Sequence, residues 1–204
     1  MLALFNSINS AVCGALGINT YLQGVIIMVC INTIAVLGMS VLTGFTRLFS
    51  FGNAGFMSIG AYTAAILTVK FNVNFLLAII LGALFAGFIA FLLGSITLRL
   101  KGDYFLITCL GFGECVRVLF NYTKNITGGS AGYPGIPAYS NALFSLVCVV
   151  LAFFAAWRFI HSKYGRNLTS IRENEMAAEA VGINAFRVKR MSFVFSAIYA
   201  GWAG

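Results

Sequence analysis

The stretch that decides how this chain is organised is residues 158–190, RFIHSKYGRNLTSIRENEMAAEAVGINAFRVKR. It holds seven of the thirteen basic residues and three of the five acidic residues, and the sequence on both sides of it is strongly apolar. Lys and Arg gather in the cytoplasmic loops of membrane proteins. We therefore expect a polar cytoplasmic segment between two membrane spans.

Local patterns within this stretch predict a helix of roughly 16 Å from Ile171 to Val181. Ser170 followed three residues later by Glu173 fits a capping box, in which each side chain accepts a backbone N–H of the first turn. Gly182 is expected to end the helix in a left-handed conformation, and Asn184 to cap the next helix. Such an element would offer a small, rigid surface outside the membrane.

The composition indicates an integral membrane protein. The 204 residues are 60% hydrophobic and 9% charged, whereas a soluble domain has about 25% charged residues. The net charge of +8 is weak evidence for nucleic-acid binding, because basic loops are common in membrane proteins. The cysteines show no metal-type spacing and are interpreted as small hydrophobic residues: Cys13, Cys30, Cys109, Cys115 and Cys148.

Runs of apolar residues predict the membrane spans, since about 20 such residues cross the hydrocarbon core. The predicted fold class is all-α, a polytopic transmembrane helical bundle with about five complete spans and the start of another. Residues 1–18 are interpreted as an interfacial or irregular segment, with a full span as the alternative. The clearest spans are 21–45, 75–98, 104–120 and 142–160, and a further one begins at Met191.

Polar residues within the spans suggest contacts with protein or water. Glu114 and Arg117 are three residues apart, so on a helix they share a face and can pair. Charges inside a span usually face the bundle interior or a polar pathway, and a structural pair and a pathway role are both open. Glycines such as Gly55 and Gly60 either pack helices closely or line a cavity.

Charge and turn residues predict the orientation. Residues 121–141 are rich in Gly and Pro, which excludes a helix there and indicates a loop. With 158–190 in the cytoplasm, alternating spans place Arg47, Arg99 and Lys101 inside and the 121–141 loop outside.

Four separate runs resemble one family, the membrane permease subunits of branched-chain amino-acid importers driven by ATP-binding-cassette (ABC) subunits. The first combines Gly165-Arg166, residues 171–175 and residues 177–184, and contains the loop that in such permeases docks on the ATPase. Met176 replaces the first Glu of the family's Glu-Ala-Ala-x-x-x-Gly pattern. The other three runs are residues 42–62, 102–117 and 127–137, so the resemblance extends over nearly the whole chain from Tyr21.

The resemblance implies one ABC-importer transmembrane domain over residues 1–204, incomplete at its C-terminus. It implies a cytoplasmic coupling loop at about 161–190 and an external loop at about 121–141. The residues expected to couple to the ATPase are Arg172, Glu173, Glu175, Ala178 and Gly182. The candidate residues of the translocation path are Thr43, Asn53, Glu114 and Arg117.

The resemblance also implies a set of partners in a bacterial or archaeal cytoplasmic (inner) membrane. They are a second homologous permease, two cytoplasmic ATP-binding subunits, a periplasmic or lipid-anchored substrate-binding protein and membrane lipid, with no nucleic acid. No catalytic residue, metal or cofactor is expected, because the sequence has no phosphate-binding Gly-x-x-x-x-Gly-Lys-Ser/Thr loop and ATP hydrolysis would come from a partner. Two alternatives are a permease for urea or short-chain amides, and a stand-alone secondary transporter or channel.

Overall fold

The structure is a computed structural model that describes residues 19–46, 48, 50–100, 103–123, 127–129, 132 and 141–204. Predictions that concern residues 1–18, Arg47, Lys101 and most of the 121–141 loop lie outside the described residues. The helices are α2 (Thr20–Thr46), α3 (Asn53–Lys70), α4 (Phe75–Thr97), α5 (Asp103–Tyr122), α7 (Ala142–Ile160), α8 (Lys163–Glu173), α9 (Glu175–Ala180) and α10 (Ala185–Ala203).

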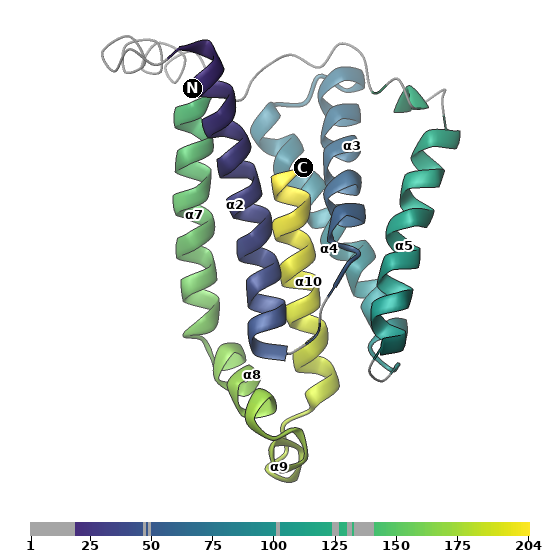
Figure 1. The fold of residues 1–204 in the computed structure, drawn as a ribbon, viewed down its shortest axis with the longest axis vertical. Helices are drawn as coiled ribbons and strands as arrows, with labels where there is room; N and C mark the ends of the chain where they lie inside the picture. Colours follow the sequence, from purple (N-terminus) through teal and green to yellow (C-terminus); the bar gives the residue numbers. More distant parts are fainter. Residues whose placement is uncertain are drawn as a thin grey trace.

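The long helices form a bundle, and α8 and α9 lie beyond one end of it (Figure 1). Within the part of the chain that the structure describes, four helices are long and apolar enough to cross a membrane, with spans at Tyr21–Thr46, Phe75–Thr97, Tyr104–Tyr122 and Ala142–Ile160. These bounds agree with the predicted ones within two residues. The predicted all-α bundle of a multi-pass membrane protein is confirmed, whereas the count of about five complete spans stays a prediction.

Helix α10 is the centre of the bundle, where it packs against α2, α3 and α4 (Figure 1). Small residues allow this close packing: a Cβ on Gly60 of α3 would collide with the backbone of Gly201 on α10. Three buried aromatic rings, Phe56, Phe105 and Phe193, join α3, α5 and α10. The Phe193 ring meets the other two edge-on, with centroids 5.5 and 5.9 Å away.

Helix α3 begins partway along the bundle rather than at its end (Figure 1). Its first turn lies against α5, where Gly55 is close enough to Gly113 that a Cβ would lie 3.2 Å from the Gly113 Cα. At Gly55 and Gly60 the structure therefore confirms the helix-packing interpretation of the glycines. A role for this run in lining a cavity stays a prediction.

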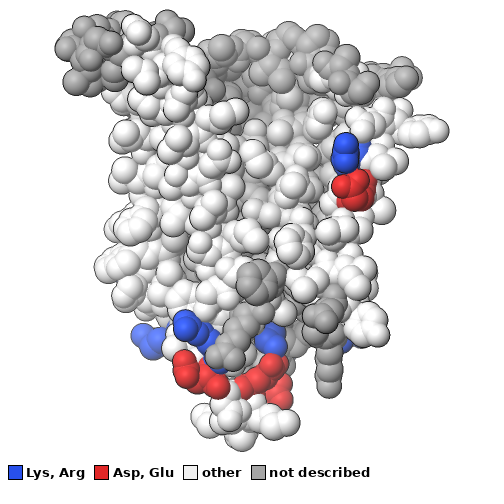
Figure 2. Space-filling view, viewed as in Figure 1, with Lys and Arg blue, Asp and Glu red and all other residues white. Residues whose placement is uncertain are grey.

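The basic residues next to the helix ends divide between the two ends of the bundle. Helices α4 and α7 end where α8 and α9 lie, whereas α3 and α5 end at the opposite end of the bundle (Figure 1). Arg99 and Arg158 therefore lie at the same end of the bundle as α8 and α9, and Lys70 lies at the other end. Figure 2 shows Lys, Arg, Asp and Glu gathered in a band over α8 and α9, with one separate pair on the α5 side. Which end faces the cytoplasm stays a prediction.

Candidate functional site

Two short helices, α8 and α9, form the polar end of the molecule. The chain between them is extended at Asn174, with φ −153° and ψ 110°. The Asn174 Oδ1 accepts a hydrogen bond from the backbone N–H of Ala177 at 3.1 Å, so Asn174 is the N-cap of α9. Glu175 follows in the first turn, where its carboxylate lies near the positive end of the helix dipole.

This break corrects the prediction of one helix from Ile171 to Val181 with a capping box at Ser170 and Glu173. Ser170 lies inside α8, and its hydroxyl donates to a carbonyl of the preceding turn at 3.1 Å. Glu173 is the last residue of α8 instead of part of a first turn. The physical reason is burial: Leu168 and Ile171 lie one helical turn apart and are both buried, which requires continuous helix through Ser170.

The end of α9 has the turn that the sequence predicts at Gly182. Gly182 has a φ of +90°, and its N–H donates to the Glu179 carbonyl oxygen at 2.9 Å. The N–H of Ile183 donates to the Ala178 carbonyl oxygen at 3.0 Å. These two bonds form a Schellman motif, which satisfies the last carbonyl groups of the helix and confirms the left-handed Gly182.

The N-cap predicted at Asn184 is also confirmed. Its Oδ1 accepts a hydrogen bond from the N–H of Arg187 at 3.0 Å. Helix α10 consequently begins at Ala185, so its first turn belongs to the polar end, and the apolar residues from Met191 follow in the same helix. A capped turn of fixed geometry thus joins α9 to the central helix of the bundle.

A small hydrophobic core, separate from that of the bundle, holds α8 and α9 in place. It contains Leu168, Ile171, Ala178, Ala185 and Val188, and Phe45 of α2 and Phe159 of α7 pack against it. Helix α8 accordingly contacts α2, α7 and α10. We call α8, α9 and the turn at 181–184 the α8–α9 unit. Packing on this core therefore ties the unit to the ends of α2 and α7 and to the first turns of α10.

The five predicted coupling residues all lie in the α8–α9 unit, but they have different surroundings. Arg172, Glu173 and Gly182 are exposed. Ala178 is only 5% exposed and belongs to the small core, so it stabilises the unit and presents no surface to a partner.

The fifth predicted residue, Glu175, forms an ion pair that the sequence analysis did not identify. The Lys189 Nζ of α10 donates to the Glu175 Oε1 at 2.6 Å. The pair links the first turn of α9 to the first turns of α10.

The structure also shows two apolar residues that sequence reasoning missed. Met176 is 84% exposed and Val181 is 82% exposed, one at each end of α9. Figure 2 shows this region as an uncharged tip beyond the band of charged residues. The sequence offered one sign of them: this short polar segment contains two large apolar residues that are not needed to fill its small core.

The second group of candidates includes the charged pair on α5. One side of α5 packs on α3 through Phe105, Cys109 and Val116. Glu114 and Arg117 lie on the other side, and the Arg117 Nη1 is 3.5 Å from the Glu114 Oε2. The predicted pairing is confirmed, but the side chains are 61% and 72% exposed and face away from this bundle.

The other two path candidates do not join this pair. Thr43 lies near the end of α2 and its hydroxyl donates to the Met39 carbonyl oxygen at 2.9 Å. Asn53 is the first residue of α3 and is half-buried. Among the described residues, no hydrogen bond or ion pair links Thr43 or Asn53 to the α5 pair. The structure thus brings two of the four candidates together.

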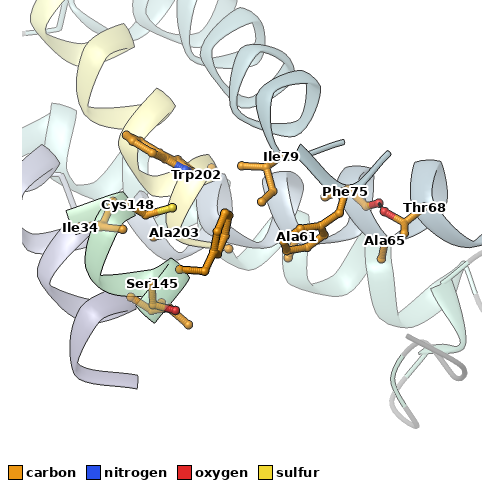
Figure 3. A pocket seen from close by; sticks show the side chains of 15 residues that line it. Ile34, Ala61, Ala65, Thr68, Phe75, Ile79, Ser145, Cys148, Trp202 and Ala203 are labelled. Atoms are coloured by element: carbon orange, nitrogen blue, oxygen red, sulfur yellow. Dashed lines mark hydrogen bonds between the residues drawn. The ribbon is translucent and has the colours of Figure 1, made fainter. Parts of the chain in front are cut away.

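A cavity of about 260 Å³ lies elsewhere, between α2, α3, α4, α7 and the end of α10 (Figure 3). Its labelled lining is mostly apolar, with Ile34, Phe75, Ile79 and Trp202 around it, and Thr68 and Ser145 add hydroxyl groups. None of the four candidate path residues lines it. The predicted path and this cavity are therefore different parts of the molecule.

Comparisons with known proteins give a consistent result. A family model described as "Branched-chain amino acid transport system / permease component" matches residues 21–204. The high-affinity branched-chain amino acid transport system permease protein LivM of Salmonella typhimurium is 34% identical over 211 residues, covering 87% of this chain and 50% of that protein. LivM of Escherichia coli is 34% identical over 202 residues, covering 82% and 48%.

A more distant relative comes from an archaeon. The probable LivM of Methanocaldococcus jannaschii is 32% identical over 130 residues, which cover 56% of this chain and 38% of that protein. No solved structure gives a significant match. The chain spans about half the length of the curated relatives it matches. Because the family model covers nearly the whole described bundle, the chain belongs to the family of permease components of branched-chain amino acid transport systems.

Proposed function

We propose that this chain is a transmembrane permease subunit of an ABC importer for branched-chain amino acids, located in the cytoplasmic membrane of a bacterium or archaeon. Its partners are a second homologous permease, two ATP-binding subunits and an external substrate-binding protein. The observation that carries the proposal is the α8–α9 unit, a capped helix pair outside the bundle with an apolar tip, in a chain of this family. ATP hydrolysis is the partners' activity.

The docking role rests on the surface of α9. Large apolar side chains that a water-facing element leaves exposed mark protein interaction sites, and a few central anchors carry most of the binding energy of an interface. Met176 and Val181 are such anchors, and Arg172, Glu173 and Glu175 lie beside them as a polar rim. The rigid turn at Gly182 transmits movement of the docked ATPase to α10.

We infer that the translocation path runs along the exposed side of α5. Glu114 is the twelfth residue of this helix, about 16 Å from its start and so near the middle of the span. Charged groups at that depth face protein or water rather than lipid. The second permease would cover this side, and the path would run between the two subunits beside Glu114 and Arg117.

A docking experiment tests the first part of the proposal. The full-length chain is co-expressed with its partners and purified through the ATPase, and Met176 and Val181 are replaced together by Ser. We expect at least tenfold less permease to be co-purified, because two apolar anchors of about 1 to 2 kcal/mol each are lost. Tyr164→Ser is the matched control, since Tyr164 is an exposed large residue on α8 instead of α9. Equal recovery of the double variant and the control would contradict docking on α9.

Labelling from the two sides of the membrane tests the orientation. Single cysteines at Ser170 of α8 and Asn121 of α5, both exposed, are introduced into a background without the native cysteines. In intact cells, an impermeant reagent should label the residue at 121 and not the residue at 170. Labelling of both positions, or of 170 alone, would overturn the proposed orientation.

Uptake assays separate the proposed substrate from the alternatives. Reconstituted with its partners, the permease should take up leucine, isoleucine or valine with ATP and the binding protein present. Uptake of urea or short amides would identify the related importer class instead. Uptake without any ATPase would identify a secondary transporter or channel.

A further inference from the structure

One arginine at the membrane edge lacks the partners that its charge requires. Arg190 of α10 has its guanidinium over the ring of Phe91, 4.4 Å from the centroid, and 5.5 Å from that of Phe186. Its Nη1 donates to the Ser95 Oγ of α4 at 3.2 Å. Its Nε is buried without any hydrogen-bond partner. The residue as a whole is partly exposed, so part of it reaches the protein surface.

The surroundings of Arg190 add positive charge rather than neutralise it. Phe91 and Ser95 are four residues apart and therefore lie on one side of α4, and Arg99 follows two residues after the helix ends at Thr97. Arg187 lies one turn before Arg190 on α10. Both Arg99 and Arg187 are exposed, and neither has an ion pair within the described residues. Arg190 is a partly desolvated cation with no ion pair among the described residues, which is costly and favours an anion from outside the chain.

The surface next to this cluster is apolar. Phe88, Leu92 and Ile96 of α4 are each at least half exposed, within a helix long and apolar enough to cross the membrane. Acyl chains would lie against them, and the arginines at the α8–α9 end of the bundle would then lie near the headgroups. A ligand that combines a phosphate with long acyl chains fits both parts.

We propose that α4 and α10 form a binding site for the phosphate of an anionic phospholipid, with Arg190 as its central ligand and Arg99 and Arg187 at its rim. Arginine suits this site because its planar guanidinium binds phosphate oxygens through two parallel hydrogen bonds while its face stacks on aromatic rings. Basic surfaces between helices at the membrane edge bind anionic headgroups in this way. The site lies apart from the candidate docking and path residues, and it depends only on the placement of α4 in a membrane.

Lipid binding would link α4 to α10. The headgroup would bind α4 through Arg99 and α10 through Arg190, near the point where α10 leaves the α8–α9 unit. Anionic lipid would thereby stabilise the angle at which α10 enters the bundle.

Native mass spectrometry of the purified assembly, with the full-length chain, tests this site. The probes are phosphatidylglycerol, phosphatidylcholine with the same acyl chains, and inorganic phosphate. We expect selective retention of phosphatidylglycerol, and a decrease of about fivefold in Arg190→Gln, the effect of one basic residue near an anionic lipid. Retention of phosphatidylglycerol by Arg190→Lys should lie between that of the unchanged protein and that of Arg190→Gln. The matched control is Arg158→Gln, an exposed arginine in the last turn of α7 at the same end of the bundle.

Each other outcome overturns the proposal. Equal retention of both lipids, or an equal decrease in Arg158→Gln, would indicate non-specific attraction. Displacement of the lipid by inorganic phosphate would indicate a site for the free ion. A thermal midpoint that Arg190→Gln lowers equally in both lipids would indicate a purely structural role.

Arg99→Gln gives the same readout should Arg190→Gln fail to assemble, because Arg99 is exposed and lies past the end of α4. Lipid retention is measured without transport. A failure of the proposed import function would therefore leave this result unaffected, and a failure of lipid binding would leave the import function untouched.

Discussion

Helix α9 is only six residues long and both of its ends are capped, whereas α5 has 20 residues and only one of its sides is covered. The α8–α9 unit has its own core, its own turn motif and an ion pair to α10. Helix α5 has an aromatic contact with the bundle on one side and a pair of charges on the other. The comparison separates a unit whose packing this chain completes by itself from a helix side that this chain leaves uncovered.

The largest effect is expected when the core of the α8–α9 unit is damaged, which tests whether this unit depends on its own core. Leu168→Ala should destabilise the unit by about 2–5 kcal/mol, because it leaves a cavity where the side chain is only 1% exposed. Limited proteolysis should then cut α8 and α9 while the spans stay intact. Met176→Ala removes a similar volume from an exposed position and should leave the cleavage pattern unchanged. Resistance of Leu168→Ala to the protease would show that the bundle alone holds the unit.

The α5 side can be tested by separating its two charges. Glu114→Gln leaves Arg117 alone in a membrane span, at a cost of about 2.5–3.5 kcal/mol. We expect transport by the reconstituted assembly to fall by roughly a hundredfold. A double change to Leu should insert and remain stable, yet still not transport. Wild-type transport by the double variant would show that lipid alone covers this side.

The turn at Gly182 tests whether the unit must keep its angle. Gly182→Val should cost roughly 1–2 kcal/mol, because the φ of +90° is strained for a residue with a branched Cβ. Substrate-stimulated ATP hydrolysis should fall while insertion is normal. Gly182→Asn is the control, since Asn tolerates this conformation and no heavy atom lies within 4 Å of the new Cβ. Identical hydrolysis in the two variants would argue against a role for the angle.

The smallest expected effect concerns the ion pair between Glu175 and Lys189. The Glu175 side chain is 49% exposed, so the pair should contribute only about 0.2–1 kcal/mol, and less at high salt. Lys189→Gln should slightly increase amide hydrogen exchange in α9 at low salt, and the difference should vanish at high salt. A difference independent of salt would mean that Lys189 acts through packing of its carbon chain.

Much of this architecture could be predicted from the sequence where one rule acted alone. The apolar spans, the left-handed Gly182, the cap at Asn184 and the pairing of Glu114 with Arg117 are examples. The break between α8 and α9 at Asn174 could not be predicted, because two possible N-cap positions lie close together in the sequence. Ser170 with Glu173 and Asn174 with Ala177 both fit N-cap rules, and only the burial of α8 selected the second.

The side of the bundle toward which Glu114 and Arg117 of α5 face could not be predicted from the sequence either. Periodicity places Glu114 and Arg117 on one side of a helix, but it does not say which neighbour covers that side. The apolar tip formed by Met176 and Val181 was missed for a related reason. An apolar residue in a short segment is ordinarily assigned to the core, and its exposure becomes visible only once the core is known.

The close contact between Gly60 and Gly201 has a mechanical consequence. Helix α10 has 19 residues and is therefore about 28 Å long, with the α8–α9 unit at one end and this contact near the other. A tilt of ~5° about one end displaces the other by ~2.5 Å. Two glycines meet as smooth surfaces, with no side chain that must leave one hole and enter another. Small shear of α10 past α3 would therefore need no change of rotamer at this crossing.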